Sequence, residues 1–225
     1  MAQFWKWAAC GVLLISFVTS AAAAVQPPVK GKEYQLLQSP QPVTDKNKVE
    51  VREFFWYGCP HCYALEPSLN KWKPHMPAGV DFKEVPAIFQ NSWKSGAQLF
   101  YTLQAMGLVS KLHDKVFDAI HAQHINLLTD PKTLFDWIAK QGVDQKKFEA
   151  TYKSFGVATK VKRAADMTRA YDIPGTPSFT IEGKYLTGPA MTLNPDRTIN
   201  YGRFFQVLDQ LIEMAHQGRT PAGKS

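Results

Sequence analysis

A C-x-x-C motif lies where a strand pattern gives way to a helix pattern, and this placement limits the folds open to the chain. Before it, residues Val49–Tyr57 are rich in the β-branched and aromatic residues of a buried strand. After it, apolar residues recur at helical spacing over His61–Lys73, and a proline suits the first helical position. The motif reads Cys59-Pro60-His61-Cys62. In this strand–turn–helix context, the two cysteines indicate redox chemistry.

The position of Cys59 predicts an unusually acidic thiol. A residue at a helix N-terminus faces unpaired backbone N–H groups and the positive end of the helix dipole, which favour an anion. His61 adds a donor or a positive charge nearby, so we expect the pKa of the Cys59 thiol to fall well below that of a free thiol. Because the thiolate exists only in the reduced protein, the oxidised protein is expected to be an oxidant. Cys62, about one turn into the helix, is expected to be more buried and to act as the resolving thiol.

Two other uses of the cysteines remain open. The first is an inert structural disulfide, although a loop with two intervening residues constrains little of the unfolded chain. The second is metal ligation by Cys59 and Cys62 with one of the six histidines, although His121 and His124 have no obvious partner at ligand spacing. Haem attachment requires C-x-x-C-H, whereas Tyr63 follows the motif. We therefore expect no metal, and no cofactor beyond a redox-active Cys59–Cys62 disulfide.

The first 24 residues predict a cleavable secretory signal peptide. They contain one cation at Lys6, an apolar run over Ala8–Val18 and a small-residue tract over Ser20–Ala24. Cleavage near Ala24 removes the first of the three cysteines and leaves the two of the motif. The mature chain is then expected in an exported compartment where disulfides persist.

Composition narrows the class of protein further. The hydrophobic fraction of 45% excludes a disordered chain, and the formal net charge is +7. A basic chain raises the question of nucleic acid, but the cations are scattered with no run of five or more. Together with the export signal, this argues against a nucleic-acid partner.

The order of the patterns predicts one α/β domain that is interrupted by helices. Strand patterns occur at Glu33–Leu37, Val49–Tyr57, Val80–Val85, Ser178–Glu182 and Tyr185–Thr187, the last two forming a hairpin around Gly183. Helical patterns follow one another from about Phe89 to Gly156, then over Val157–Tyr171, and a last amphipathic helix carries Phe204 to Ile212. We assign residues 25–88 and 157–217 to the α/β domain, 89–156 to an inserted helical domain and 218–225 to a flexible tail.

A proline that opens a strand marks a second informative stretch. Pro177 directly precedes the strand pattern at Ser178–Glu182, so Thr176-Pro177 is a candidate for a cis peptide bond in a tight turn. Such a turn beside Cys59 is expected to leave the Thr176 backbone open to pair with an extended substrate. An ordinary trans turn is the alternative.

Glu53 is the third informative residue. A period of two places it on the same strand face as Val49, Val51, Phe55 and Tyr57, so a carboxylate falls among apolar residues near the motif. One interpretation is a paired or edge-exposed glutamate. The functional interpretation is a buried carboxyl of raised pKa that exchanges protons with Cys62.

These features together resemble the DsbA family of periplasmic thiol:disulfide oxidants, within the thioredoxin superfamily, over nearly the whole mature chain. The resemblance rests on Glu53-Phe54-Phe55, on Cys59-Pro60-His61-Cys62-Tyr63, on the inserted helices, on Gly175-Thr176-Pro177 and on the hairpin at Gly183-Lys184-Tyr185. It implies a thioredoxin fold with an inserted α-helical domain. It also implies that reduced, unfolded exported proteins are the substrates and that a quinone-linked, DsbB-like membrane oxidase restores the disulfide.

The resemblance also implies roles for single residues. Cys59 attacks or is attacked, Cys62 resolves, and His61 tunes the pair. Thr176 and Pro177 line the substrate groove. Glu53 is the buried carboxyl, and Pro60 belongs to the redox motif.

The leading hypothesis is therefore a protein dithiol oxidase. A disulfide isomerase or reductant is the rival within redox chemistry, and a chaperone or metal-binding module is the rival outside it. An isomerase of this fold generally holds its substrate between two active sites. Since the chain has neither a second C-x-x-C nor room for a dimerisation module before Glu33, we expect a monomer.

Overall fold

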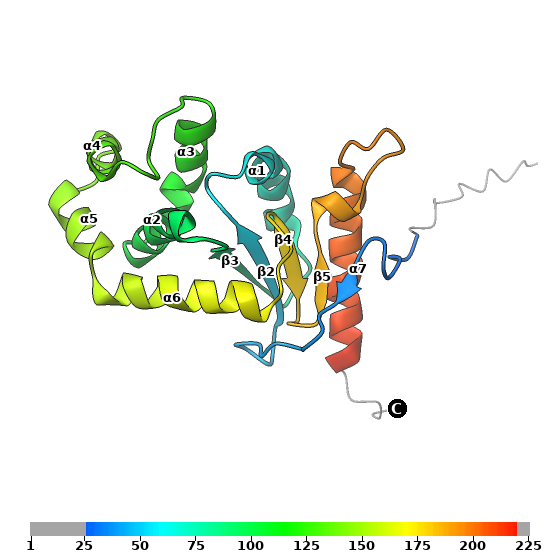
Figure 1. Ribbon diagram of the computed structural model, residues 1–225. Helices are drawn as coiled ribbons and strands as arrows, with labels where there is room; N and C mark the ends of the chain where they lie inside the picture. The colour runs from blue at the N-terminus through cyan, green and yellow to red at the C-terminus, as the bar shows by residue number, and fades with distance from the viewer. Residues whose placement is uncertain (1–25, 220–225) are drawn as a thin grey trace, which may run out of the picture.

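A computed structural model describes residues 26–219, which form a mixed five-stranded sheet with helices on both sides (Figure 1). The predicted signal peptide lies outside the described residues. The strands are β1 (Gln35–Leu36), β2 (Val49–Phe55), β3 (Val80–Pro86), β4 (Ser178–Ile181) and β5 (Tyr185–Thr187), in the spatial order β1-β5-β4-β2-β3. β2 is central, parallel to β3 and antiparallel to β4. All five predicted strands are confirmed, with β1 shortened to two residues.

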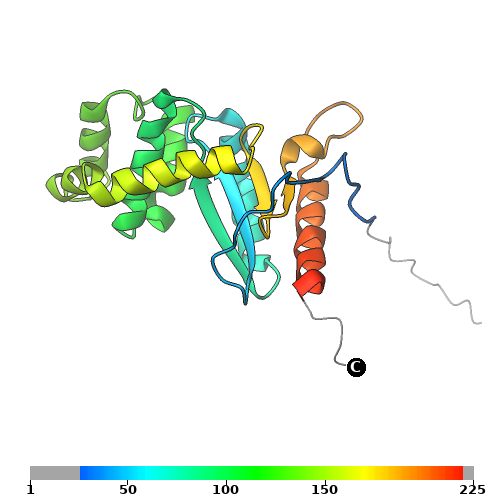
Figure 2. The same cartoon turned by 60° about the horizontal axis from the view of Figure 1, so that its bottom comes forward.

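The helices divide into two that cover the sheet and a group inserted between β3 and β4. They are α1 (Pro60–Trp72), α2 (Lys94–Ala105), α3 (Val109–His121), α4 (Pro131–Lys140), α5 (Gln145–Tyr152), α6 (Phe155–Ala170) and α7 (Tyr201–Arg219), with short 3-10 turns at Lys73–His75, Asn91–Trp93 and Pro189–Met191. Both views show α2 to α5 gathered on one side of the sheet and α6 returning from them to it (Figures 1 and 2). The fold is thus the predicted α/β arrangement with inserted helices.

Side-chain caps set where the inserted helices begin. Asp130 accepts a hydrogen bond from the Lys132 amide at 3.0 Å at the start of α4, and Asp144 does the same for the Lys147 amide at 2.9 Å in α5. Ser154 Oγ accepts from the Val157 amide at 3.3 Å, so α6 begins two residues before the predicted start. The predicted division at 156/157 therefore falls inside the first turn of α6, and the division into domains stays a prediction.

Two apolar cores hold these layers together. One lies between the sheet and helices α1 and α7 and contains Val49, Val51, Leu65 and Phe204. The other joins the end of β2 to the inserted helices and contains Phe55, which meets Phe100 edge-on with 5.2 Å between ring centroids. The first core lies directly beneath α1, the helix that begins at the C-x-x-C motif.

β2 is a buried strand, as the sequence predicts. All seven of its residues are buried, because helices cover both faces of the central strand. The second face buries charges as well: Glu50 pairs with Arg52 at 2.5 Å and with Lys83 at 2.7 Å. Both faces of β2 are therefore buried, and one of them contains an ion-pair cluster.

The C-terminal helix extends further than expected. α7 runs to Arg219, so residues 218 and 219, assigned to the flexible tail, are helical. Arg219 donates to Glu182 and to the Lys46 carbonyl, which anchors this last turn. Residues 220–225 lie outside the described part of the chain. Within residues 26–219, no helix has the length and apolar character needed to cross a membrane.

Candidate active site

The two cysteines of the motif lie at the start of α1, as expected. Cys59 is the N-cap, with φ −88° and ψ 116°, and Pro60 is the first helical residue. The Cys59 amide donates to the Trp56 carbonyl at 2.9 Å, which closes the turn after β2. Both cysteines are free thiols, with Cys59 7% exposed and Cys62 fully buried. Cys59 is thus less exposed than its N-cap position predicts.

The turn before Cys59 requires a glycine. A Cβ on Gly58 would come within 2.5 Å of the Trp56 indole ring. That ring is stacked on Trp93 of the insertion with 4.0 Å between ring centroids, so it has little freedom to move away. The glycine therefore lets the aromatic pair pack directly against the redox turn.

The Cys59 thiol has a pKa of about 5, against an ordinary value of 9.0. The largest cause that lowers this pKa is a hydrogen bond from the Cys62 thiol; burial opposes it, and the Thr176 side chain and the backbone amides of Cys62 and His61 lower the pKa further. In the thiol form, Cys59 Sγ lies 3.3 Å from the Thr176 carbonyl oxygen. That contact favours the proton, so Thr176 assists the thiolate only through its side chain. His61 acts here through its amide, and its side chain is exposed.

This lowered pKa stabilises the reduced protein. The contribution is complete above pH 9, the ordinary pKa of the thiol, and is lost as the pH falls through about 5. At pH 7, two units above the folded pKa, it is about 2 to 3 kcal/mol. The disulfide form has no thiol to ionise and gains nothing, so reduction of Cys59–Cys62 is favoured by that amount.

Cys62 has the opposite character. Burial is the main cause that raises the pKa of its thiol well above 9.0, and the adjacent Cys59 sulfur and the Glu53 charge raise it further. Cys62 therefore remains protonated under conditions in which Cys59 is a thiolate. The two thiols of one motif are thus differentiated for a nucleophilic and a resolving role.

We expect alkylation of the reduced protein to distinguish the two thiols. The rate at Cys59 should rise with pH to a plateau with a midpoint near pH 5, because only the thiolate reacts. Cys62 should stay unmodified while the protein is folded. Peptide mapping after iodoacetamide pulses between pH 3 and pH 9 measures both rates. Modification of Cys62 first, or a Cys59 midpoint near pH 9, would contradict the assignment.

The Thr176-Pro177 peptide bond is cis, as predicted, and it lies beside Cys59. Thr176 and Pro177, together with His61, line a groove of about 340 Å³. The rest of the lining is mostly apolar and includes Pro174, Leu186, Met191, Leu193 and Ile199. The structure therefore brings four predicted site residues to one surface, with an apolar groove next to the more reactive sulfur.

Glu53 is 1% exposed, and neither of its carboxylate oxygens has a hydrogen-bond partner within the described residues. Burial raises the pKa of this carboxyl well above 4.5; the Glu66 and Glu84 charges add to the effect and the Lys73 charge opposes it. The paired or edge-exposed interpretation is thus wrong, since Glu53 lies on the central strand. The Glu53 charge raises the pKa of the Cys62 thiol, so the carboxyl acts electrostatically on Cys62.

Comparison with known proteins decides the family. Residues 69–194 match the family described as "DSBA-like thioredoxin domain". The thiol:disulfide interchange protein DsbA of Burkholderia cepacia is 42% identical over 194 residues, covering 86% of this chain and 88% of that protein. The chain belongs to the DsbA family. It is accordingly a thiol:disulfide oxidoreductase, and its fold is the thioredoxin fold with inserted helices.

Other relatives agree over most of the chain. DsbA of Pseudomonas aeruginosa is 39% identical, covering 90% of this chain and 92% of that protein. Its crystal structure matches with a TM-score of 0.76 at 39% identity, over 84% of this chain and 95% of that one. Reduced DsbA1 from Neisseria meningitidis matches with a TM-score of 0.74 at 27% identity, over 87% and 99%. The family match begins after the C-x-x-C motif, so the residue roles here rest on the site geometry.

In this DsbA-family chain, helix α3 holds the turn before Cys59, which sequence reasoning did not foresee. The Tyr57 hydroxyl lies 2.9 Å from His113 Nδ1, and the Tyr57 carbonyl oxygen lies 2.8 Å from His121 Nε2. His121 also stacks on Tyr63 with 5.0 Å between ring centroids, and the Tyr63 hydroxyl donates to Asp118 at 3.0 Å. The inserted helices are thereby coupled to the redox turn.

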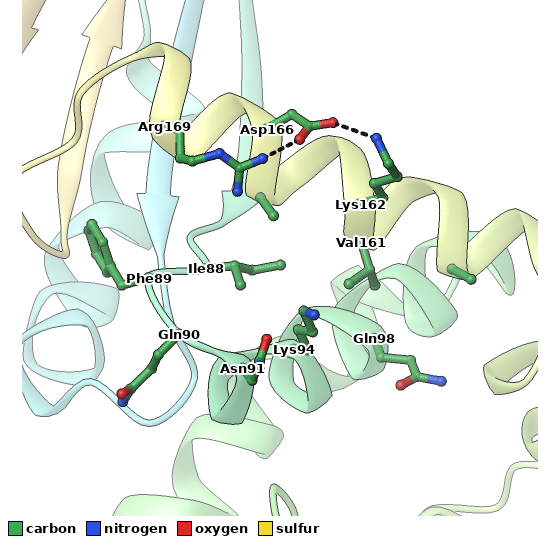
Figure 3. A pocket seen from close by; sticks show the side chains of 12 residues that line it. Ile88, Phe89, Gln90, Asn91, Lys94, Gln98, Val161, Lys162, Asp166 and Arg169 are labelled. Carbon is green, nitrogen blue, oxygen red and sulfur yellow. Dashed lines mark hydrogen bonds and ion pairs between the residues drawn. The ribbon is translucent and has the colours of Figure 1, made fainter.

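A separate hollow of about 550 Å³ lies away from these residues, between the segment after β3, α2 and α6 (Figure 3). Its rim carries Asp166, paired with Lys162 at 3.2 Å and with Arg169 at 2.5 Å. None of the predicted site residues lines it. Within residues 26–219, no group of three His, Cys, Asp or Glu side chains is arranged to hold a metal ion.

Proposed function

We propose that this protein dithiol oxidase donates its Cys59–Cys62 disulfide to reduced, unfolded proteins newly exported to the periplasm. The observation that carries this proposal is the contrast within the motif: a Cys59 thiol of pKa about 5 beside a Cys62 thiol held protonated by burial. Stabilisation of the reduced form gives the disulfide its oxidising power. A redox-active cysteine pair thus does the chemistry.

The first step transfers the disulfide to the substrate. A substrate thiolate attacks Cys59 Sγ, the more exposed sulfur of the pair. The Cys59–Cys62 bond breaks, a substrate–Cys59 mixed disulfide forms, and Cys62 leaves as a thiolate. The protonated Glu53 carboxyl supplies the proton that buried Cys62 requires.

The second step releases the product. The other substrate thiolate attacks the substrate sulfur of the mixed disulfide, which forms the substrate disulfide and expels Cys59 as a thiolate. Cys59 is a good leaving group because of its low pKa. Two electrons have passed from the substrate to the cysteine pair. In our proposal, a quinone-linked, DsbB-like membrane oxidase then removes these electrons.

The groove beside Cys59 supports a polypeptide substrate. We assign it to the apolar residues that flank the substrate cysteine, held next to Thr176 and Pro177. Leu193 is the exposed apolar part of its rim, at 50% exposure. A chain bound there has its cysteine within reach of Cys59, because Thr176 lies against that sulfur.

A charge in this groove is expected to impair peptide substrates selectively. The oxidised protein reacts with a reduced apolar peptide and, separately, with dithiothreitol, and the rate constants of the two reactions are compared. In Leu193→Asp, the peptide rate constant divided by the dithiothreitol rate constant should fall about tenfold, the effect of one lost leucine contact. Val29→Asp is the matched control, because Val29 is exposed to a similar extent and lies outside the groove. An unchanged ratio for Leu193→Asp would exclude the groove as the peptide site.

An isomerase is the rival function, and oligomeric state separates it from an oxidase. We propose that the chain acts as a monomer with one redox motif. The test compares oxidation of a reduced, unfolded secreted protein with rescue of the same protein in scrambled form, alongside light scattering. Faster oxidation by a monomer supports the proposal. A stable dimer whose rescue of scrambled substrate exceeds its dithiol oxidation would overturn it.

A further inference from the structure

His113 is a buried, polar side chain that the mechanism above does not use. It lies on α3, is 5% exposed, and is enclosed by the rings of Phe55, Phe100 and Phe117 at 5.1, 5.9 and 5.2 Å between centroids. A polar group in such surroundings is costly unless both of its nitrogens are satisfied. The identity of its two polar neighbours therefore matters.

The first neighbour fixes the orientation of the ring. His113 Nδ1 lies 2.9 Å from the Tyr57 hydroxyl. Burial raises the pKa of Tyr57 well above 10.0, so the phenol keeps its proton, and we assign the phenol as the donor to Nδ1. A ring that accepts at Nδ1 carries a hydrogen on Nε2. His113 thus presents an N–H group on the side away from Tyr57.

The second neighbour is Glu66, on α1 one turn after Cys62. Glu66 Oε1 lies 3.5 Å from His113 Nε2, and Glu66 is 4% exposed. Within the described residues, neither Glu66 oxygen nor Nε2 has any hydrogen-bond partner. The ring N–H therefore has one polar group to face, and that group is a buried carboxyl.

Glu66 is in turn coupled to Glu53. Each of the two carboxyls is buried, and the Glu66 charge acts on Glu53. Like charges in a buried site disfavour each other, so a negative charge on Glu66 favours the protonated form of Glu53. The Lys73 charge, paired with Glu84 at 2.6 Å, opposes this effect by lowering the pKa of Glu53. Chemistry at Cys62 requires that the proton be on Glu53.

We propose that His113 is a positioning residue that keeps the Glu66 side chain in its place 3.5 Å from Nε2, from which the Glu66 charge keeps a proton on Glu53, ready for Cys62. The inference rests on the proposed role of Glu53 as proton donor. It gives the inserted helix α3 a part in the redox step, which His113 exerts through Glu66 of α1. The Tyr57 hydroxyl fixes the orientation of the His113 ring.

The test measures the second-order rate constant for reduction of the oxidised protein by dithiothreitol at pH 7, using acid quench, alkylation and mass detection. His113→Leu should lower it about tenfold, within the range of coupling between contacting residues. His113→Gln, whose amide reaches the Nε2 position, should restore it to within about twofold, and His113→Asn, which reaches only Nδ1, should not. Val116→Ala is the packing control on α3: it should lower thermal stability and leave the rate unchanged.

A double-variant cycle separates this inference from the role of Glu53. In a Glu53→Gln background, His113→Leu should cause no further loss of rate, because the proton it places is gone. If Glu53→Gln is slow but His113→Leu reacts at the normal rate, the role of His113 is overturned while that of Glu53 stands. If His113→Leu causes the same loss of rate in the native and the Glu53→Gln backgrounds, or if His113→Gln and His113→Asn are equally slow, His113 has only a structural role. A normal rate for Glu53→Gln would refute both proposals. If His113→Leu does not fold, the Gln and Asn pair makes the same comparison.

Discussion

Cys59→Ser is expected to abolish disulfide transfer altogether, whereas Cys62→Ser is expected to stop the reaction at a mixed disulfide. Serine at 59 removes the sulfur that substrate thiolates attack. Serine at 62 leaves Cys59 free to react with a disulfide, but no second thiol remains to resolve the adduct. The asymmetry follows from the geometry, since Cys59 is the N-cap and is 7% exposed, whereas Cys62 is fully buried.

The measurement is mass spectrometry of each variant after incubation with oxidised glutathione. Cys62→Ser should accumulate a single glutathione adduct at Cys59, and Cys59→Ser should accumulate none on its folded form. The native protein should pass to its internal disulfide. An adduct on Cys62 in the Cys59→Ser variant, at a rate similar to that of Cys59, would reverse the roles of the two thiols.

Glu53→Gln is expected to slow reduction of the oxidised protein by about 10²-fold, the lower end of general acid–base catalysis. The amide has the same shape but cannot give a proton to the Cys62 thiolate, which buried surroundings disfavour. The raised pKa of Glu53 means that the carboxyl is protonated, and so competent, at higher pH than an ordinary glutamate. The slow step in the variant should therefore be the release of Cys62.

Glu50→Gln is the matched control for this prediction. Glu50 lies on the same strand and is equally buried, but hydrogen bonds from Arg52 and Lys83 overcome burial and lower its pKa to about 2. Its replacement breaks a buried ion-pair cluster, so stability should fall while the rate of reduction remains near normal. Similar losses of rate in both variants would indicate a general effect of disturbing β2.

Local patterns predicted the part of the site that is local in sequence. The strand, the turn and Pro60 place Cys59 at a helix N-terminus, and the structure puts it there. The contrast between the two thiols was also predicted, but its leading cause was not. The hydrogen bond from Cys62 contributes most to the low pKa of Cys59, ahead of Thr176 and the helix amides. The position of Cys59 at a helix N-terminus does not by itself show that the Cys62 thiol donates a hydrogen bond to it.

Groups contributed by other elements were missed. Glu53 was found because a carboxyl interrupts an apolar strand face, but Glu66 sits in a helix where a glutamate is ordinary. His113 lies 56 residues from its partner Tyr57, and no pattern in one sequence reports such a contact.

In the proposed function, the Cys59–Cys62 disulfide itself passes to a protein substrate. The most direct measurement mixes the oxidised protein with one equivalent of a reduced, unfolded secreted protein that has two cysteines, without oxygen or any other oxidant. Alkylation and mass analysis then count thiols on both chains. We predict one new substrate disulfide for every chain in which Cys59 and Cys62 become thiols, with a mixed disulfide through Cys59 at early times. A substrate that stays reduced, or that gains its disulfide while Cys59 and Cys62 remain oxidised, would contradict the claim.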